Sequence, residues 1–234
     1  MPSVSAVVVA AGRGERLGAG PSKAFRALGG RPLLEHSLEA LARVSDIVEV
    51  VLVLREGDLA AWAERSAEAR KRWRVSRAVA GGLERFDSVR AGLRALGARS
   101  DLVLVHDAAR PFVHAAAVRR LIETAARVGG AIAGSPSSDT LKRLGEGNRI
   151  LETLDRERIW RAETPQVFRR EPLLEAVERA GGAGSRPTDE AEVAEAAGIA
   201  VEVVPSEEPN PKITRPADLA FAEFLLSGRA GAAS

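Results

Sequence analysis

The sequence predicts an α/β fold in which a mostly parallel, twisted sheet is flanked by helices and carries an inserted β-hairpin arm. Continuous apolar, β-branched runs at 4–10, 47–54 and 102–105 are typical of strands buried on both faces of a sheet. Segments with helical spacing separate these runs, and only the stretch at 135–161 departs from the alternation. Alternating strands and helices favour βαβ units, so we expect a Rossmann-like arrangement.

The remaining elements follow from local signals. Pro32 is expected to open a helix, because proline fits the first helical position, and leucines follow it at helical spacing. Further helices are predicted at 58–72, 87–96, 118–126, 171–180, 189–197 and 216–226, and further strands at 75–79 and 200–204.

The arm is predicted from two short runs, at 140–144 and 149–154, that flank a turn at 145–148. A projecting hairpin exposes backbone edges and apolar side chains, so we expect it to pack against a second subunit. The sequence shows no linker and no internal repeat. We therefore expect a single domain over 1–227 that includes the arm at about 136–156, followed by a disordered tail at 228–234.

Composition excludes several classes of protein. The 234 residues include 34 basic and 32 acidic ones, and the resulting net charge of +2 with 4% aromatic residues and no tyrosine argues against a nucleic-acid binder. Without cysteine there are no disulfides or thiolate zinc sites, and three histidines do not favour a multi-histidine metal site. No apolar run reaches membrane-spanning length, and the first residues lack a signal-peptide pattern. We expect a cytoplasmic protein with no nucleic-acid or membrane partner.

A glycine-rich loop at 11–23 directly follows the first strand, where backbone N–H groups can approach phosphates closely. Arg16 and Lys23 add cations at its two ends. The loop does not match the G-x-x-x-x-G-K-[ST] phosphate loop. Its glycines also miss the G-x-G-x-x-G dinucleotide spacing by one residue, which disfavours an NAD(P)-dependent oxidoreductase. A flexible surface loop is the other interpretation.

Three further segments carry candidate chemistry. Asp107 ends a buried strand, so it is a candidate Mg²⁺ ligand beside phosphates, or else a helix cap or a partner of Arg110. His106 is equally consistent with a structural hydrogen-bonded residue. Gly82 and Ser88 lie where a backbone could approach a base, although a plain strand-to-helix turn would look the same. Lys212 lies in a proline-flanked segment, and only four of the 34 basic residues are lysines, which favours a functional lysine over a surface one.

Taken together, these segments resemble one family. The residues AAGRGER at 10–16 with Ser22 and Lys23 look like the nucleoside-triphosphate transferase signature. Further matches are GGLERFDSV at 81–89, VHDAARP at 105–111, DT at 139–140, LDR at 154–156, TPQ at 164–166 and NPKIT at 210–214. With them the chain resembles the 2-C-methyl-D-erythritol 4-phosphate cytidylyltransferases over nearly its whole length. Ala24 and Leu83 depart from the pattern, since many members carry Gln and some an acidic residue there.

The resemblance implies cytidylyl transfer from CTP to 2-C-methyl-D-erythritol 4-phosphate in non-mevalonate isoprenoid biosynthesis, with Mg²⁺ as cofactor and a homodimer formed through the arm. It implies that Arg16, Lys23 and Lys212 are catalytic, and that Asp107 binds the metal. The implied nucleotide-binding residues are Ala10, Ala11, Gly12, Gly14, Gly82, Ser88 and Asp107. Thr164 and Lys212 are expected to meet the substrate phosphate, and Thr140, Arg156 and Arg110 to reach the polyol phosphate from the partner subunit.

This chemistry accounts for the lack of an obvious general base. A phosphate monoester has a second pKa of about 6 and is already largely dianionic at neutral pH. It needs charge neutralisation and in-line positioning, which cations supply. Two alternatives stay open from the sequence. A ribitol-5-phosphate cytidylyltransferase would share the CTP half of the site, and a non-catalytic nucleotide sensor would share its binding loops.

Overall fold

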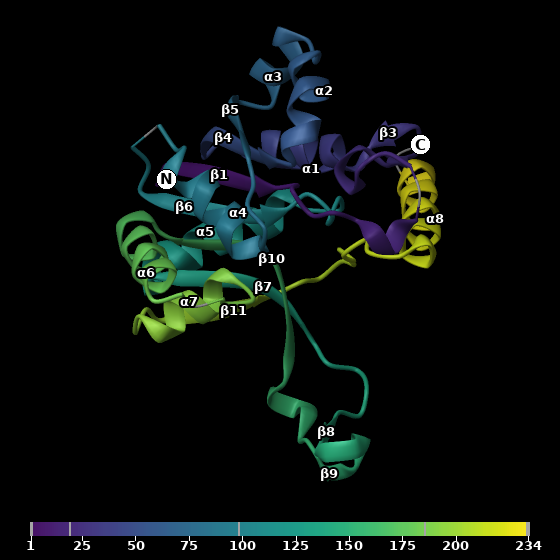
Figure 1. Ribbon diagram of the computed structural model, residues 1–234, viewed down its shortest axis with the longest axis vertical. Helices are drawn as coiled ribbons and strands as arrows, with labels where there is room; N and C mark the ends of the chain where they lie inside the picture. The colour runs from purple at the N-terminus through teal and green to yellow at the C-terminus, as the bar shows by residue number, and fades with distance from the viewer. Residues whose placement is uncertain (1, 19, 98, 185, 233–234) are drawn as a thin grey trace.

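A seven-stranded sheet forms the centre of the molecule (Figure 1). The computed structural model describes residues 2–18, 20–97, 99–184 and 186–232. The strands are β1 (Val4–Val9), β4 (Ile47–Leu54), β5 (Val75–Ala80), β6 (Leu102–Asp107), β7 (Gly130–Pro136), β10 (Trp160–Arg169) and β11 (Val201–Pro205). Their order is β11-β7-β10-β6-β1-β4-β5. Only β10 runs antiparallel to its neighbours, which confirms the mostly parallel sheet.

Helices cover both faces of this sheet. On one face lie α1 (Leu33–Ala42) and α5 (Ala115–Val128), and on the other lie α4 (Arg85–Arg94), α6 (Arg170–Gly182) and α7 (Glu190–Ala196). The short helices α2 (Leu59–Ala63) and α3 (Ala67–Arg72) follow β4, and α8 (Pro216–Ala232) ends the described chain. No helix in the described part of the chain is long and apolar enough to cross a membrane.

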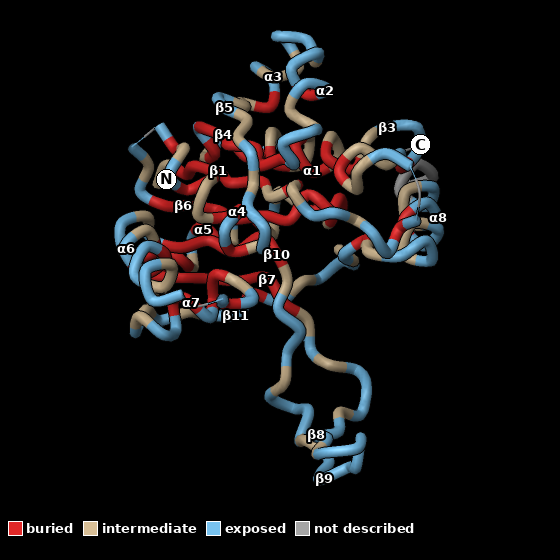
Figure 2. The backbone as a smooth tube through the Cα atoms, viewed as in Figure 1, coloured by how far each residue is buried: buried red, intermediate tan, exposed pale blue. Residues whose placement is uncertain are grey.

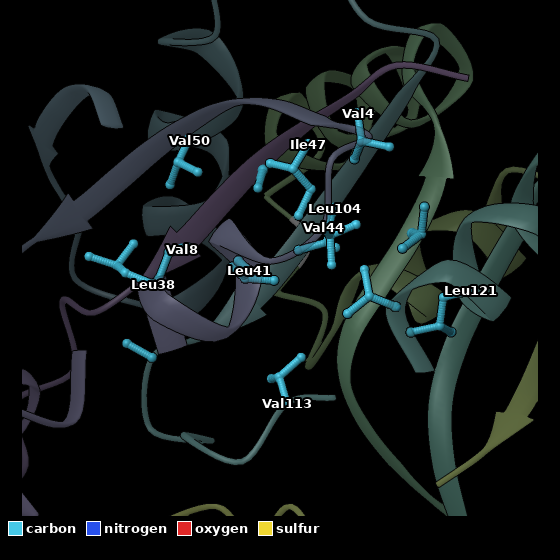
Figure 3. Close-up of a cluster of buried hydrophobic side chains, with 14 of the residues drawn as sticks. Val4, Val8, Leu38, Leu41, Val44, Ile47, Val50, Leu104, Val113 and Leu121 are labelled. Atoms are coloured by element: carbon cyan, nitrogen blue, oxygen red, sulfur yellow. The ribbon is translucent and has the colours of Figure 1, made fainter. Parts of the chain in front are cut away.

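Strand β1 shows why the sheet is buried on both faces. Its side chains alternate, so Val4 and Val8 pack towards α1 and α5, whereas Val7 packs towards α4 and α6. Figure 3 shows Val4 and Val8 with Leu38 and Leu121 in the first of these two cores. A strand without a solvent-facing side needs a continuous apolar run, which is the pattern that the sequence carries.

The predicted hairpin arm is confirmed in outline. Strands β8 (Lys142–Leu144) and β9 (Ile150–Thr153) pair antiparallel at the tip of a long excursion between β7 and β10 (Figure 1). The turn between them contains Gly147 with φ of 61°, a conformation that favours glycine. Figure 2 shows that the arm is exposed along almost its whole length, in contrast to the buried sheet. It leaves Leu144, Ile150 and Leu151 more than half exposed, at 51%, 58% and 60%.

The structure corrects three expectations. The helix predicted at 58–72 is two helices, because the Ser66 hydroxyl accepts a hydrogen bond from Ala69 N and starts α3 anew. Strands β7 and β10 were not predicted, since their sequences carry glycine and proline, which weaken a strand pattern. The tail expected to be disordered from residue 228 instead continues α8 to Ala232, and residues 233–234 lie outside the described residues.

The remaining elements of the described chain are short. A two-stranded sheet joins β2 (Ala27–Leu28) and β3 (Arg31–Pro32). Single turns of 3-10 helix at Glu15–Leu17 and Lys23–Phe25 shape the glycine-rich loop. The loop therefore has defined local structure on both sides of residue 19, which lies outside the described residues.

Candidate active site

A cleft of about 830 Å³ opens at the carboxyl ends of β1, β5 and β6. Ligands of parallel α/β sheets commonly bind at this edge. The sequence assigns catalytic or nucleotide-binding roles to ten residues, and all ten line the cleft: Ala10, Ala11, Gly12, Gly14, Arg16, Lys23, Gly82, Ser88, Asp107 and Lys212. Segments that are up to two hundred residues apart in sequence therefore meet in one place.

Glycines allow the two loops of the cleft to pack closely. Gly14 has φ of 68°, and a Cβ atom there would lie 2.8 Å from the Cβ of Lys23. A Cβ atom on Gly81 would lie 2.4 Å from the Cβ of Ala11, and one on Gly82 would lie 2.3 Å from the Cβ of Asp87. Neither contact is sterically possible, so the turn at 81–82 can approach the first loop only because it carries glycine.

Ser88 shapes this turn from behind. Its side chain is buried, and its hydroxyl accepts a hydrogen bond from Gly82 N (3.2 Å) and donates one to Glu84 O (3.1 Å). Next to it, the Glu84 and Asp87 side chains form a reciprocal capping box that starts α4 two residues earlier than the sequence suggests. The Ser88 hydroxyl thus fixes the backbone that faces the cleft.

The surroundings of Lys23 disfavour its charged form. Burial lowers its pKa to about 8, and the nearby charges of Lys212 and Arg16 act in the same direction. The carboxylate of Asp107 opposes them only in part. An anion placed in the cleft would relieve this repulsion, so the site favours a negatively charged ligand.

Asp107 lies between two cations on the floor of the cleft. Its Oδ1 accepts from Arg85 Nε at 3.0 Å, and its Oδ2 lies 2.6 Å from Lys212 Nζ. Burial alone would raise the pKa of this carboxyl, but Arg85 and Lys212 outweigh it and hold the pKa well below its usual range. Asp107 is therefore ionised at neutral pH.

Sequence reasoning missed the pair formed by Arg85 and Glu190. Arg85 belongs to the GGLERFDSV segment but received no role, and Glu190 of α7 gave no signal in the sequence. The two groups form a bidentate ion pair, with Nη1–Oε1 at 2.8 Å and Nη2–Oε2 at 3.0 Å. The Glu190 side chain is only 2% exposed. A pairing between residues 105 positions apart is a property of the fold, and no spacing rule could have found it.

Thr164 lies behind Asp107 and does not line the cleft. Its hydroxyl accepts from Asp107 N at 3.0 Å and lies 3.1 Å from His106 Nδ1. Burial lowers the pKa of His106 to about 4, so the ring is neutral at pH 7. Because Nε2 faces the carbonyl of Arg110, which can only accept, Nε2 donates and Nδ1 accepts from the Thr164 hydroxyl. The His106 interpretation as a structural residue fits these contacts.

Arg110 fastens the Lys212 segment to the body of its own chain. Its Nη1 donates to Asn210 O at 2.8 Å, and Asn210 Oδ1 in turn accepts from Phe112 N at 3.0 Å. The sequence interpretation groups Arg110 with the arm residues of a partner subunit. In the structure, Arg110 lies three residues after the end of β6 and contacts the Lys212 segment of its own chain; the subunit whose substrate it meets stays a prediction.

Thr140 and Arg156 lie on the exposed arm, outside the cleft. Arg156 donates a short hydrogen bond to Ser138 O, which ties the two sides of the arm together near its middle. Figure 1 shows the arm projecting away from the body that holds the cleft. Within one chain, the residues expected to bind the polyol phosphate are thus divided between two separate regions.

The carboxylate of Asp107 fits a metal that arrives with a phosphate ligand. Among the described residues, no group of three or more acidic or histidine side chains could hold a metal ion by itself. Mg²⁺, however, is commonly held by one or two carboxylates together with substrate phosphates and water. Each Asp107 oxygen has one protein partner and a second lone pair, so the residue can serve as a single protein ligand.

The two departures from the family pattern, Ala24 and Leu83, differ in their exposure. Ala24 is buried, at 3% exposure, and its methyl group cannot form a hydrogen bond that would hold Lys23. Leu83 is 85% exposed at the rim of the cleft. Neither position carries a charge that contacts Asp107 or Lys212.

Comparisons with known proteins agree with this architecture. The model of the IspD family, described as 2-C-methyl-D-erythritol 4-phosphate cytidylyltransferase, matches residues 4–228. The 2-C-methyl-D-erythritol 4-phosphate cytidylyltransferase of Halalkalibacterium halodurans is 41% identical over 226 residues, which cover 95% of this chain and 96% of that protein. The bifunctional IspD/IspF enzyme of Anaeromyxobacter dehalogenans is 46% identical, and the match covers 95% of this chain but 57% of that longer protein.

Solved structures show the same likeness. The 2-C-methyl-D-erythritol 4-phosphate cytidylyltransferase of Thermus thermophilus superposes with a TM-score of 0.76 at 37% identity, covering 94% of this chain and 98% of that one. The 4-diphosphocytidyl-2C-methyl-D-erythritol synthase of Anaerococcus prevotii superposes with a TM-score of 0.84 at 30% identity, covering 97% and 96%. Sequence and fold thus agree over almost the whole chain, which belongs to the 2-C-methyl-D-erythritol 4-phosphate cytidylyltransferase family.

Proposed function

We propose that this chain transfers the cytidylyl group of CTP to 2-C-methyl-D-erythritol 4-phosphate, giving 4-diphosphocytidyl-2-C-methyl-D-erythritol and pyrophosphate for non-mevalonate isoprenoid biosynthesis. One observation carries the proposal: the cleft gathers Arg16, Lys23, Asp107 and Lys212 at the carboxyl edge of the sheet in a chain of this family. These three cations and one carboxylate suit a reaction in which two phosphate-bearing substrates meet.

The reaction is a substitution at the α-phosphorus of CTP. A phosphate oxygen of the polyol phosphate forms the new P–O bond, and the bond to the pyrophosphate leaving group breaks. Since the attacking phosphate is already ionised near pH 7, the protein's task is to align the groups and neutralise their charge. We assign this neutralisation to Lys23 and Arg16 on the nucleotide side and to Lys212 on the polyol-phosphate side.

The nucleotide half is assigned to the two glycine-containing loops. Backbone N–H groups of Gly12 and Gly14 are suited to the triphosphate, because small residues let the backbone come close to phosphate oxygens. The cytidine is assigned to the surface formed by Ala10, Ala11 and Gly82, which Ser88 supports. Asp107 would hold Mg²⁺, which would neutralise triphosphate charge when it is bound.

The polyol half is assigned to groups from two subunits. Lys212 and the region around Arg110 and Thr164 come from one chain, and Thr140 and Arg156 from the arm of the other. The length and exposure of the arm support a homodimer, since its apolar side chains would be covered by a partner. A cytoplasmic location is also part of the proposal.

The reaction is tested by measuring pyrophosphate release with Mg²⁺ and every pairing of CTP, ATP, GTP or UTP with methylerythritol 4-phosphate or ribitol 5-phosphate. The proposal expects turnover with CTP and methylerythritol phosphate. Turnover confined to CTP and ribitol phosphate would assign the chain to the alternative substrate. Binding of CTP without turnover in any pairing would indicate a nucleotide sensor.

The depressed pKa of Lys23 predicts a basic limb in the pH profile. Lys23 must be protonated to neutralise the triphosphate, and its pKa in the free enzyme is about 8. The value of kcat/KM for CTP reports the free enzyme and should therefore fall as the pH rises above about 8. Lys23→Arg keeps a cation that stays protonated throughout this pH range, so this limb should disappear from its profile even if the overall rate is lower. An unchanged basic limb in Lys23→Arg would assign it to another group.

The shared site predicts complementation between two impaired variants. Arg156→Ala should raise KM for the polyol phosphate roughly tenfold to a hundredfold, with KM for CTP unchanged, because a charge-assisted hydrogen bond is lost. A mixed dimer with Lys23→Ala has one site that keeps both Lys23 and Arg156. Equal mixing should thus restore about a quarter of the wild-type rate at low polyol phosphate, since half the dimers are mixed and each has one intact site. A rate equal to the average of the two variants would mean that each arm serves its own chain.

A further inference from the structure

We propose that Glu190 and Arg85 act together as a positioning pair that fixes the direction of the Asp107 carboxylate and keeps it available to a cation at the reaction centre. The inference rests on the proposed function, because it assigns a role to Asp107 within that reaction. The pair spans the sheet edge from α7 to the start of α4, and neither residue belongs to the set that the sequence assigns to the site.

Each of the three guanidinium nitrogens of Arg85 donates a hydrogen bond to a carboxylate. Two of its nitrogens donate to Glu190, and the third, Nε, donates to Asp107 Oδ1 at 3.0 Å. Although Arg85 lines the cleft, its three nitrogens already have partners, so it is not available to swing onto a phosphate. Arg85 is therefore a positioning residue rather than a further phosphate-binding cation.

The position of Glu190 is itself fixed on both sides by Gln166 of β10. The amide nitrogen of Gln166 donates to Asp189 Oδ2 at 2.9 Å, and its Oε1 accepts from Ala191 N at 3.1 Å. Gln166 is buried and pairs in register with Val105 of β6, two residues before Asp107. A continuous set of contacts thus runs from β10 through α7 and Arg85 to Asp107.

The charge of Glu190 has a consequence for Asp107. Because Glu190 shares the positive charge of Arg85, Arg85 balances Asp107 only in part, and the carboxylate can also pair with Lys212 and with a cation that accompanies the nucleotide. Without the Glu190 charge, Arg85 would have Asp107 as its only anionic partner among these contacts. The two would pair more strongly, and the carboxylate would be less available to a metal ion.

A contribution to stability alone does not explain why these two positions carry charged side chains. Burying two charges costs desolvation free energy, and well-packed apolar side chains often replace a buried pair with no loss of stability. A clamp between α4 and α7 therefore does not need charge. In addition, Arg85 Nε donates to the carboxylate of Asp107 in the cleft. A contact that only held α4 and α7 together would not require this bond.

Three variants and a control separate these roles. Glu190→Gln keeps the shape and removes the charge, and Glu190→Asp keeps the charge with a shorter side chain. Arg85→Lys keeps the cation, but its single nitrogen cannot reproduce the bidentate bond to Glu190 together with the bond to Asp107. Glu49→Gln is the matched control, because Glu49 is also a buried glutamate but bonds Ser5, Ser76 and Gly97 N away from the cleft.

The decisive readout is the effect of Mg²⁺ on CTP affinity, measured calorimetrically with Mg²⁺ and with EDTA. Glu190→Gln and Arg85→Lys should each reduce the gain in affinity that Mg²⁺ gives by about tenfold, while Glu49→Gln keeps the wild-type gain. The kcat of Glu190→Gln and of Arg85→Lys should fall about tenfold to a hundredfold, with KM for the polyol phosphate within about twofold of wild type. Glu190→Asp should recover part of both losses, because it keeps the charge.

The outcomes distinguish this inference from the proposed function. A wild-type Mg²⁺ effect and wild-type kcat in Glu190→Gln and Arg85→Lys, with only a lowered Tm like that of Glu49→Gln, would overturn the positioning role while the reaction stands. Absence of turnover in wild type and in Glu49→Gln would overturn the proposed reaction. The measurements of CTP affinity with Mg²⁺ and with EDTA would still test the pair. Absence of Mg²⁺-dependent CTP binding in wild type would overturn both.

Discussion

Lys23→Ala is expected to lower kcat for cytidylyl transfer by about 10²–10³, the usual cost of removing one preorganised charge from a transition state. Lys23 lies against Gly14 at the mouth of the cleft, where it shares the pocket with Arg16 and Lys212. In the mechanism proposed above, its ammonium group faces the triphosphate as charge moves to the leaving pyrophosphate. The change is measured as kcat at saturating CTP and polyol phosphate.

The same substitution should leave the folded state almost unaffected. The pKa of Lys23 is lowered from 10.5 to about 8 in the folded chain, so below pH 8 its charge opposes folding rather than supporting it. Removing that charge should therefore not lower Tm, apart from a small loss of side-chain packing. Lys71→Ala on the exposed part of α3 is the matched control and should change neither kcat nor Tm. Near-normal turnover of Lys23→Ala would contradict its assignment to the transition state.

Asp107→Asn is expected to lower kcat by about 10² or more and to raise the Mg²⁺ concentration needed for half-maximal rate. The carboxylate accepts from Arg85 on one oxygen and pairs with Lys212 on the other. An amide of the same shape carries no charge and cannot accept with its nitrogen, so one of these cations loses its partner. Rate measurements across a Mg²⁺ titration give both quantities.

The control for this substitution is Asp101→Asn. Asp101 accepts hydrogen bonds from Ser3 at the amino end of the sheet and lies outside the cleft. It should leave the Mg²⁺ dependence unchanged. If Asp107→Asn kept wild-type kcat and the wild-type Mg²⁺ requirement, Asp107 would be a structural residue, and the proposed metal position would be wrong.

The acid side of the pH profile provides a related expectation about Asp107. Its folded pKa lies below its unfolded value, so the stability that it contributes is present above the unfolded pKa of 3.8 and is lost as the pH falls further. Any loss of rate between pH 7 and 5 should thus come from protonation of the substrate phosphate, whose second pKa is about 6, and not from Asp107.

Much of the fold could be predicted because its central strands carry strong local signals. Strands β1, β4 and β6 are continuous apolar runs, since each is buried on both faces, and this pattern needs no knowledge of neighbours. Strand β10 could not be predicted in the same way. Thr164 and Pro165 interrupt it, and its pairing register shifts between Ala162 and Gln166. Only its neighbours β6 and β7 define it as a strand.

The candidate site likewise contains residues with a local sequence signal and residues whose contacts depend on the fold. Gly14, Lys23 and Asp107 could be chosen from sequence because each follows or ends a buried strand in a recognisable segment. The contacts of Thr164 could not be foreseen, since its hydroxyl is engaged by a residue 57 positions away. The pairing of Arg85 with Glu190 likewise depends on how the fold brings the first residues of α4 and α7 together, which no local pattern encodes.

The most direct measurement is a crystal structure with CTP and Mg²⁺ bound. The account predicts the triphosphate against Gly12, Gly14 and Lys23, the cytosine against the turn at 81–82, and Lys212 turned towards the open side of the α-phosphate. It also predicts that the arm of a second subunit brings Arg156 to that side. A nucleotide bound elsewhere, or a triphosphate that does not contact Lys23, would contradict the account of this cleft as the site of cytidylyl transfer.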